Sequence, residues 1–223
     1  MNYREMDIYE NELKFIIQNK NQYASIYNYL CKYFLLCPYR KSQVVDYYYD
    51  YQGKLLKKGI SYRIRYRPNA SLNLKISGMK TGYINSRHEY SFKTENKDIS
   101  NSDMQNINCV INNLLKKKLE LNSLDKMEVA VKLVSERICF TLYSREKDIL
   151  GNYFLLGWVF FDSVENTFTK NHFYEFELEA STEKVSPYTY EIFNKIGNEL
   201  IQMGYEDSKD SKYERAMTQI NRS

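Results

Sequence analysis

The stretch Glu10-Asn11-Glu12-Leu13-Lys14-Phe15 carries a charged side chain at every second position. Alternate residues of a β-strand point to the same face of a sheet. Read as a strand, the stretch therefore places Glu10, Glu12 and Lys14 on one face, and Leu13 and Phe15 on the other. Two carboxylates and an ammonium group are thus directed to the same side, where they could bind ions.

The same alternation recurs in four further segments. They are Arg63-Ile64-Arg65, Leu74-Lys75, Arg87-His88-Glu89 and Glu175-Phe176-Glu177-Leu178-Glu179. One solvated face of an antiparallel sheet commonly shows this pattern. Here, however, carboxylates gather on the first and the last of these five segments and cations on the middle ones, whereas like charges on neighbouring strands destabilise a solvated sheet. This sorting favours an ion-binding face.

The rest of the chain alternates between short segments rich in Tyr, Ile and Val and longer segments with helical periodicity. We predict strands over 9–17, 44–50, 61–67, 72–77, 87–93, 128–134, 137–143, 153–162 and 173–180. We predict helices over 23–36, 103–118 and 187–203, the last two capped by Ser100 or Ser102 and by Ser186. No repeat or linker divides the sequence, so we expect one α+β domain over residues 1–223, built around some eight strands.

The composition excludes several classes of protein. With 43% apolar residues, 8 Gly and 3 Pro in 223 residues, the chain is neither collagenous nor disordered. A net charge of +4 is too small to suggest a nucleic-acid partner. The four cysteines lack the paired spacing of zinc sites, and the chain shows no signal peptide and no apolar run long enough to span a membrane. We expect a soluble, cytoplasmic protein with reduced thiols and no membrane partner.

If the sheet closes into a barrel, its charged face becomes the lumen. An unpaired buried ion costs several kcal/mol or more, so water, a metal and an anionic ligand must occupy such a lumen. Carboxylate oxygens are ligands for divalent cations, and Lys and Arg bind phosphate oxygens. The ligand that this pattern favours is a metal-chelated polyphosphate.

In this order, the motifs resemble the CYTH superfamily, also called triphosphate tunnel metalloenzymes, whose signature is an N-terminal Glu-x-Glu-x-Lys strand. Here that strand is Glu10, Glu12 and Lys14. Further segments similar to the family's follow in its order across nearly the whole chain: Asp46–Asp50, Leu55–Arg65, Leu74-Lys75, Arg87–Glu89, Tyr174–Glu177 and Ser211–Ala216. Six weak motifs in order make a specific signal.

The resemblance implies an eight-stranded antiparallel β-barrel with flanking helices that binds a triphosphate and two divalent ions, Mg²⁺ or Mn²⁺. Carried over by motif, the metal ligands would be Glu10, Glu12, Glu175 and Glu177. The phosphate-binding residues would be Lys14, Arg63, Arg65, Lys75, Arg87, Arg137 and Lys212. Lys14 and Glu89 would also be catalytic, with Glu89 assisting the second ion or orienting a water.

The implied activity is divalent-metal-dependent hydrolysis of tripolyphosphate or of a triphosphorylated small molecule. One alternative is a class IV-like adenylate cyclase that converts ATP to cyclic AMP and pyrophosphate, and another is a non-catalytic nucleotide- or polyphosphate-binding module. One departure from the family is Ser135-Glu136-Arg137, where members often have Lys-x-Arg. One lumen cation is therefore missing, or Lys132 supplies it from a shifted register.

Overall fold

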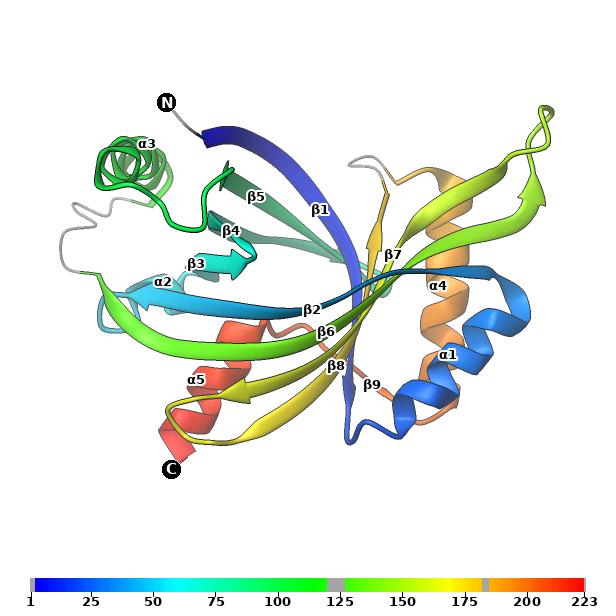
Figure 1. Ribbon diagram of the computed structural model, residues 1–223. Coiled ribbons are helices and arrows are strands. Elements are labelled where there is room, and N and C mark those ends of the chain that lie inside the picture. Colours follow the sequence, from blue (N-terminus) through cyan, green and yellow to red (C-terminus); the bar gives the residue numbers. More distant parts are fainter. Residues whose placement is uncertain (1–2, 120–126, 182–184, 223) are drawn as a thin grey trace.

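The computed structural model describes residues 3–119, 127–181 and 185–222, which fold around a closed antiparallel barrel (Figure 1). Its strands follow one another around the barrel in the order β5-β4-β3-β2-β6-β7-β8-β1, and pairing of β1 with β5 closes it. The strands are β1 (Tyr3–Ile17), β2 (Leu35–Asp50), β3 (Ile60–Arg67), β4 (Asn69–Thr81), β5 (Ile84–Thr94), β6 (Glu128–Lys147), β7 (Tyr153–Asn166) and β8 (His172–Ala180). The expected eight-stranded α+β barrel is confirmed.

Strand β1 closes the barrel because its two halves pair with different neighbours. Its first half runs along β5, where Glu10 lies opposite Arg87. Its second half runs along β8, where Lys14 lies opposite Glu177, and a short strand, β9 (Glu206–Asp207), is added beside it. Residues 10–15 of β1 are therefore the seam of the barrel.

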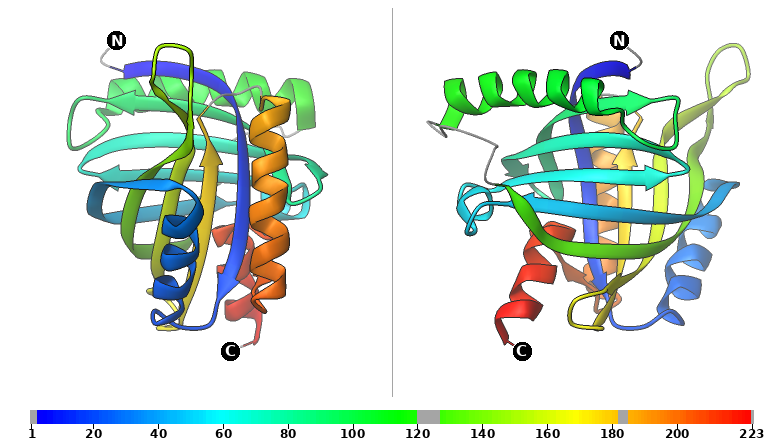
Figure 2. Two further views of the ribbon diagram at one scale, coloured as in Figure 1. Left: turned by 90° about the vertical axis from the view of Figure 1, so that its right-hand side faces the viewer. Right: turned by 60° about the vertical axis from the view of Figure 1, so that its left-hand side comes forward.

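Three helices cover the apolar outer face of the barrel, on two opposite sides (Figures 1 and 2). On one side, α1 (Gln22–Tyr33) and α4 (Pro187–Gln202) pack with Leu13 and Phe15 of β1 in one buried cluster. On the other side, α3 (Asn101–Leu119) packs against the outer faces of β3, β4 and β5. Within the described part of the chain, no helix combines the length and apolar character that crossing a membrane requires.

A fourth helix, α5 (Lys212–Arg222), packs against one end of the barrel. Its Tyr213 lies in a buried cluster with the inward-facing residues Leu133 and Val164, and its ring stacks on Tyr48 with the ring centroids 5.1 Å apart. Among the described residues, these contacts fill the lumen at that end, whereas its lining reaches exposed residues, such as Arg40 and Lys93, at the other. We call these the α5 end and the open mouth.

Asp50 joins α5 to the barrel. Its carboxylate accepts hydrogen bonds from the backbone N–H groups of Leu55 and Leu56, both at 3.0 Å, in the short helix α2 (Lys54–Lys57). It also accepts one from the Tyr213 hydroxyl at 2.8 Å. One buried side chain thus satisfies donors from two helices.

Several predicted boundaries are wrong. The segments 128–134 and 137–143 form one continuous strand, β6, because Ser135 and Glu136 stay paired with Val44 and Gln43 of β2. Strand β2 begins at residue 35, before the predicted residue 44, because this extension pairs with the far half of β6. Helix α1 correspondingly ends at Tyr33, and α2 and α5 were not predicted. Both predicted serine caps are confirmed. The Ser100 hydroxyl accepts a hydrogen bond from the backbone N–H of Asp103, and the Ser186 hydroxyl accepts one from that of Thr189, each at 3.1 Å.

We expect Asp50→Ala to lower the free energy of unfolding by about 2–4 kcal/mol, because it leaves buried donors of α2 and α5 without an acceptor. Asp148→Ala is the matched control. Asp148 also accepts two backbone N–H groups, of Leu150 and Asn152, but those bonds are exposed to water that can replace them. Urea denaturation measures both variants, and equal losses would contradict the structural role of Asp50.

Candidate functional site

The lumen contains a cavity of about 470 Å³ whose lining is dominated by charge. Ten of the lining residues are Lys or Arg and five are Glu. Every residue predicted for the site lines this cavity except Glu175, which is fully buried below it. The lining residues that were predicted are Glu10, Glu12, Lys14, Arg63, Arg65, Lys75, Arg87, Glu89, Arg137, Glu177 and Lys212.

Lys75 lies between two of the glutamates. Its ammonium is 2.5 Å from Glu10 Oε2 and 3.0 Å from Glu89 Oε2. Although burial alone would lower it, Glu10 and Glu89 raise the pKa of Lys75. Burial alone would likewise raise the pKa of Glu89, yet Lys75 and Arg63 lower it. Lys75 and Glu89 are therefore both charged at neutral pH, with Glu89 held further by Asn73 Nδ2 at 2.8 Å.

A second group of ion pairs joins the seam strands β1, β5 and β8. Lys14 Nζ lies 3.0 Å from Glu12 Oε1 and 3.0 Å from Glu177 Oε1, and Arg87 Nη1 lies 3.4 Å from Glu12 Oε1. Although burial opposes it, Lys14 and Arg87 hold the pKa of Glu12 well below its usual range. The predicted metal and phosphate ligands of β1 thus neutralise one another.

Asp46 positions two of the predicted phosphate-binding arginines. Arg65 donates from Nε to Oδ1 at 2.7 Å and from Nη2 to Oδ2 at 2.8 Å. Arg63 Nη1 is 3.7 Å from Oδ2 and donates to the Tyr48 hydroxyl at 3.0 Å. Although burial opposes it, Arg65 and Arg63 lower the pKa of Asp46 well below its usual range. The sequence analysis assigned Asp46 no role. Its position on the same face of β2 as Tyr48, which lines the cavity, could have indicated one.

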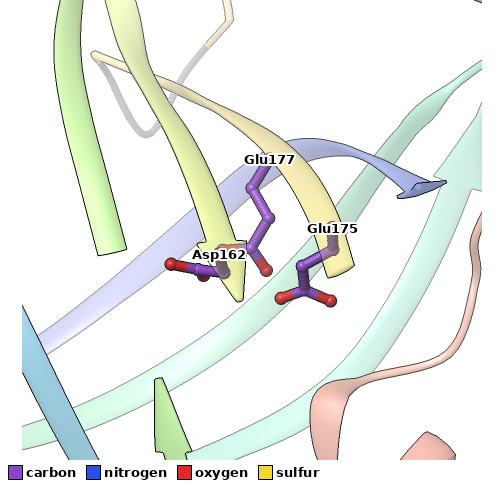
Figure 3. Close-up of side chains that lie close together, drawn as sticks. All are labelled: Asp162, Glu175 and Glu177. Carbon is purple, nitrogen blue, oxygen red and sulfur yellow. The ribbon is translucent and has the colours of Figure 1, made fainter. Parts of the chain in front are cut away.

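Three buried carboxylates, Asp162, Glu175 and Glu177, meet at the α5 end of the lumen (Figure 3). One oxygen of each lies within 4.8 Å of the others. Lys212 Nζ lies among them, 3.0 Å from Asp162 Oδ2, 3.0 Å from Glu177 Oε1 and in contact with Glu175. Arg137 donates from Nε to Asp162 Oδ1 and from Nη2 to Glu177 Oε2, both at 2.7 Å.

These carboxylates, the acidic triad, fit a divalent cation of the Mg²⁺ or Mn²⁺ type, which prefers oxygen ligands. Both carboxylate oxygens of Glu175 are buried and have no hydrogen-bond partner among the described residues. Each instead contacts a cation, Lys212 or Arg215. A divalent ion could replace the contacts that Lys212 and Arg215 make with these carboxylates. The sequence analysis did not predict Asp162 as a metal ligand, although an acidic residue within the apolar run of β7 is a sign of a special role. The predicted metal ligands Glu10 and Glu12 lie outside this triad.

Two details of the sequence interpretation are corrected. Ser135 is buried and occupies the inward position on β6, two residues before Arg137, whereas Lys132 lies outside over the ring of Tyr47. The register is therefore not shifted, and Lys132 does not replace the missing cation. The expected separation of acids from bases is also wrong, because barrel closure interleaves them in cross-strand pairs such as Lys14 with Glu177.

The comparisons with known proteins concern the fold. No known family model and no curated protein matches the sequence. A candidate adenylyl cyclase from Hippeastrum, described as having a dominant triphosphatase activity, superimposes with a TM-score of 0.54 at 14% identity, over 94% of this chain and 95% of that one. A candidate adenylate cyclase from Bacillus halodurans superimposes with a TM-score of 0.53 at 14% identity, over 96% and 98%. The chain therefore has the tunnel fold that the resemblance implied.

Glu179 lies in the lumen among other carboxylates. Burial and the charge of Glu10 raise its pKa, with Glu12 and Glu89 adding to this and Lys75 opposing it, from an ordinary 4.5 to about 8. The folded protein therefore retains a proton on Glu179 over a pH range in which the unfolded chain has lost it.

It follows that the contribution of Glu179 to the stability of the metal-free protein falls as pH rises from about 5 to about 8, because this carboxyl group is protonated in the folded state and ionised in the unfolded state there. In Glu179→Gln this contribution is absent. We therefore expect the free energy of unfolding of the variant to fall by about 2 kcal/mol less than that of the wild-type protein over that pH range. Urea denaturation at several pH values measures it. Parallel pH profiles for the two proteins would show that Glu179 has an ordinary pKa.

Proposed function

We propose that this chain is a divalent-metal-dependent hydrolase of tripolyphosphate or of a triphosphorylated small molecule. The observation that carries the proposal is the meeting of a buried acidic triad with a row of Lys and Arg inside a lumen closed at one end. Carboxylate oxygens are suited to a metal and the cations to phosphate oxygens. The shared fold of a protein described as a triphosphatase supports the same reading.

The cations would bind and orient the phosphates. Arg63 and Arg65 are already held by Asp46 and Tyr48, so they need little reorganisation to meet an anion. Lys14 and Arg137 both contact Glu177, which places them beside the acidic triad. Positioned cations of this kind supply most of the catalysis in phosphoryl transfer, because charge on the phosphoryl oxygens is stabilised in the transition state.

Metal ligands in this proposal are Asp162, Glu175 and Glu177, with Glu10 and Glu12 serving a second ion. Divalent ions at these positions would neutralise phosphate charge and lower the pKa of a water. Glu89 is ionised and fixed by Lys75 and Asn73, so it can accept a hydrogen bond from the attacking water and orient it. The water oxygen bonds to the terminal phosphorus as the bridging P–O bond breaks, which releases inorganic phosphate.

We expect Asp162→Asn and Glu175→Gln to lower the rate of phosphate release from tripolyphosphate about a hundredfold or more, because each removes a charged oxygen ligand. Glu165→Gln is the matched control, since Glu165 lies on β7 but pairs with Lys170 at the surface. Thermal melting shows whether each variant folds.

Phosphorus NMR of reactions with tripolyphosphate and ATP, with Mg²⁺ or Mn²⁺, identifies the products. Inorganic phosphate whose release depends on Asp162 and Glu175 supports the hydrolase. Formation of pyrophosphate and a cyclic nucleotide from ATP would instead show that the protein is a cyclase. Metal-dependent binding without turnover would show that it is a binding module.

A further inference from the structure

Three cations at the open mouth differ from all the others in the cavity. Arg40, Arg67 and Lys93 line the same lumen, and Arg40 and Lys93 are exposed, which places them at its opening. Each of the seven predicted phosphate-binding cations has a carboxylate within 4 Å. Among the residues that the structure describes, Arg40, Arg67 and Lys93 have none. The outer end of the lumen therefore has an excess of positive charge.

Arg67 shows the effect of this excess. Its Nε is buried and has no hydrogen-bond partner within the described ranges. Burial and repulsion from Arg137, Arg40 and Arg65 lower the pKa of its guanidinium to about 10. Buried donors are normally satisfied and buried charges paired. A guanidinium held among three other arginines is thus a site that an anion would stabilise.

The spacing along β3 separates this cluster from the inner cations. Arg63, Arg65 and Arg67 point into the lumen at alternate positions, and the four-residue step from Arg63 to Arg67 spans about 13 Å. Three phosphorus atoms joined by two bridging oxygens are shorter than this. A triphosphate bound at Arg63 is therefore too short to extend along β3 to the backbone position of Arg67.

We propose that Arg40, Arg67 and Lys93 form an outer anion subsite that binds the phosphate groups beyond the third in a linear polyphosphate chain. The placement of the first three phosphates rests on the proposed function. The aromatic residues of the cavity lining favour a chain without bases, because both are already covered: Tyr48 by Tyr213, and Phe160 by Arg137 at 4.2 Å from the ring centroid. Trp158 pairs with Glu179 across β7 and β8 but does not line the cavity.

Calorimetric titration without divalent metal compares tripolyphosphate with a longer linear polyphosphate. We expect the wild-type protein to bind the longer chain about tenfold more tightly, as charge-assisted hydrogen bonds are added. The double substitution Arg40→Gln and Arg67→Gln should remove this gain and change tripolyphosphate affinity by less than about twofold. Lys41→Gln is the matched control, because Lys41 follows Arg40 on β2 and is exposed outside the cavity. Lys93→Gln, at an exposed position of the same subsite, should also reduce the gain in affinity for the longer chain.

The proposal would be overturned if the wild-type protein bound both chains with equal affinity. It would also be overturned if the double variant lost affinity for both chains by the same factor. Tighter binding of a 5′-triphosphorylated oligonucleotide through the same arginines, without a gain for polyphosphate, would also overturn it. The same samples assayed with Mg²⁺ or Mn²⁺ test the proposed function separately. Absence of phosphate release would refute the hydrolase while the ratio of affinities still decides the subsite.

Discussion

The burial of charge inside a closed barrel is the constraint on which the rest of this structure depends. Removing an ion from water costs several kcal/mol unless a partner of opposite sign is close. Closure of β1 onto both β5 and β8 brings such partners together, as where Lys14 meets Glu12 and Glu177. The barrel can therefore keep a charged lumen while its outer face packs apolar side chains against the helices.

The distribution of ion pairs also makes the two ends of the lumen different. Near α5, Lys212, Arg137 and Arg215 each contact a carboxylate of the acidic triad. At the mouth, Arg40, Arg67 and Lys93 are not balanced by carboxylates within the described residues. A cleft with an excess of one sign concentrates counter-ions and speeds their entry. The same ion pairs that stabilise the fold thus leave a field that attracts an anion to the mouth and directs it inward.

The alternation of residues predicted the inner face correctly, because strand geometry repeats every two residues whatever the neighbouring strands are. It failed where polarity was interpreted as a break. The predicted strands 128–134 and 137–143 left out Ser135 and Glu136, yet β6 continues through them, with Glu136 facing outward to Lys20 at 2.9 Å. Asp46 and Asp162 were assigned no role from the sequence, since nothing local shows that Arg65 and Arg137 lie beside them.

The sequence by itself determined which side chains of one strand share a face, because the face that a residue occupies depends only on local backbone geometry. Only the tertiary structure decided which of them pair, since pairing depends on the register of strands far apart in the chain. Asp162 and Glu175 lie opposite each other in the β7–β8 register. Lys212 reaches them from α5, the helix that packs against one end of the barrel. Long-range contacts of this kind leave no periodic trace in the sequence, and they turn a charged strand face into a site.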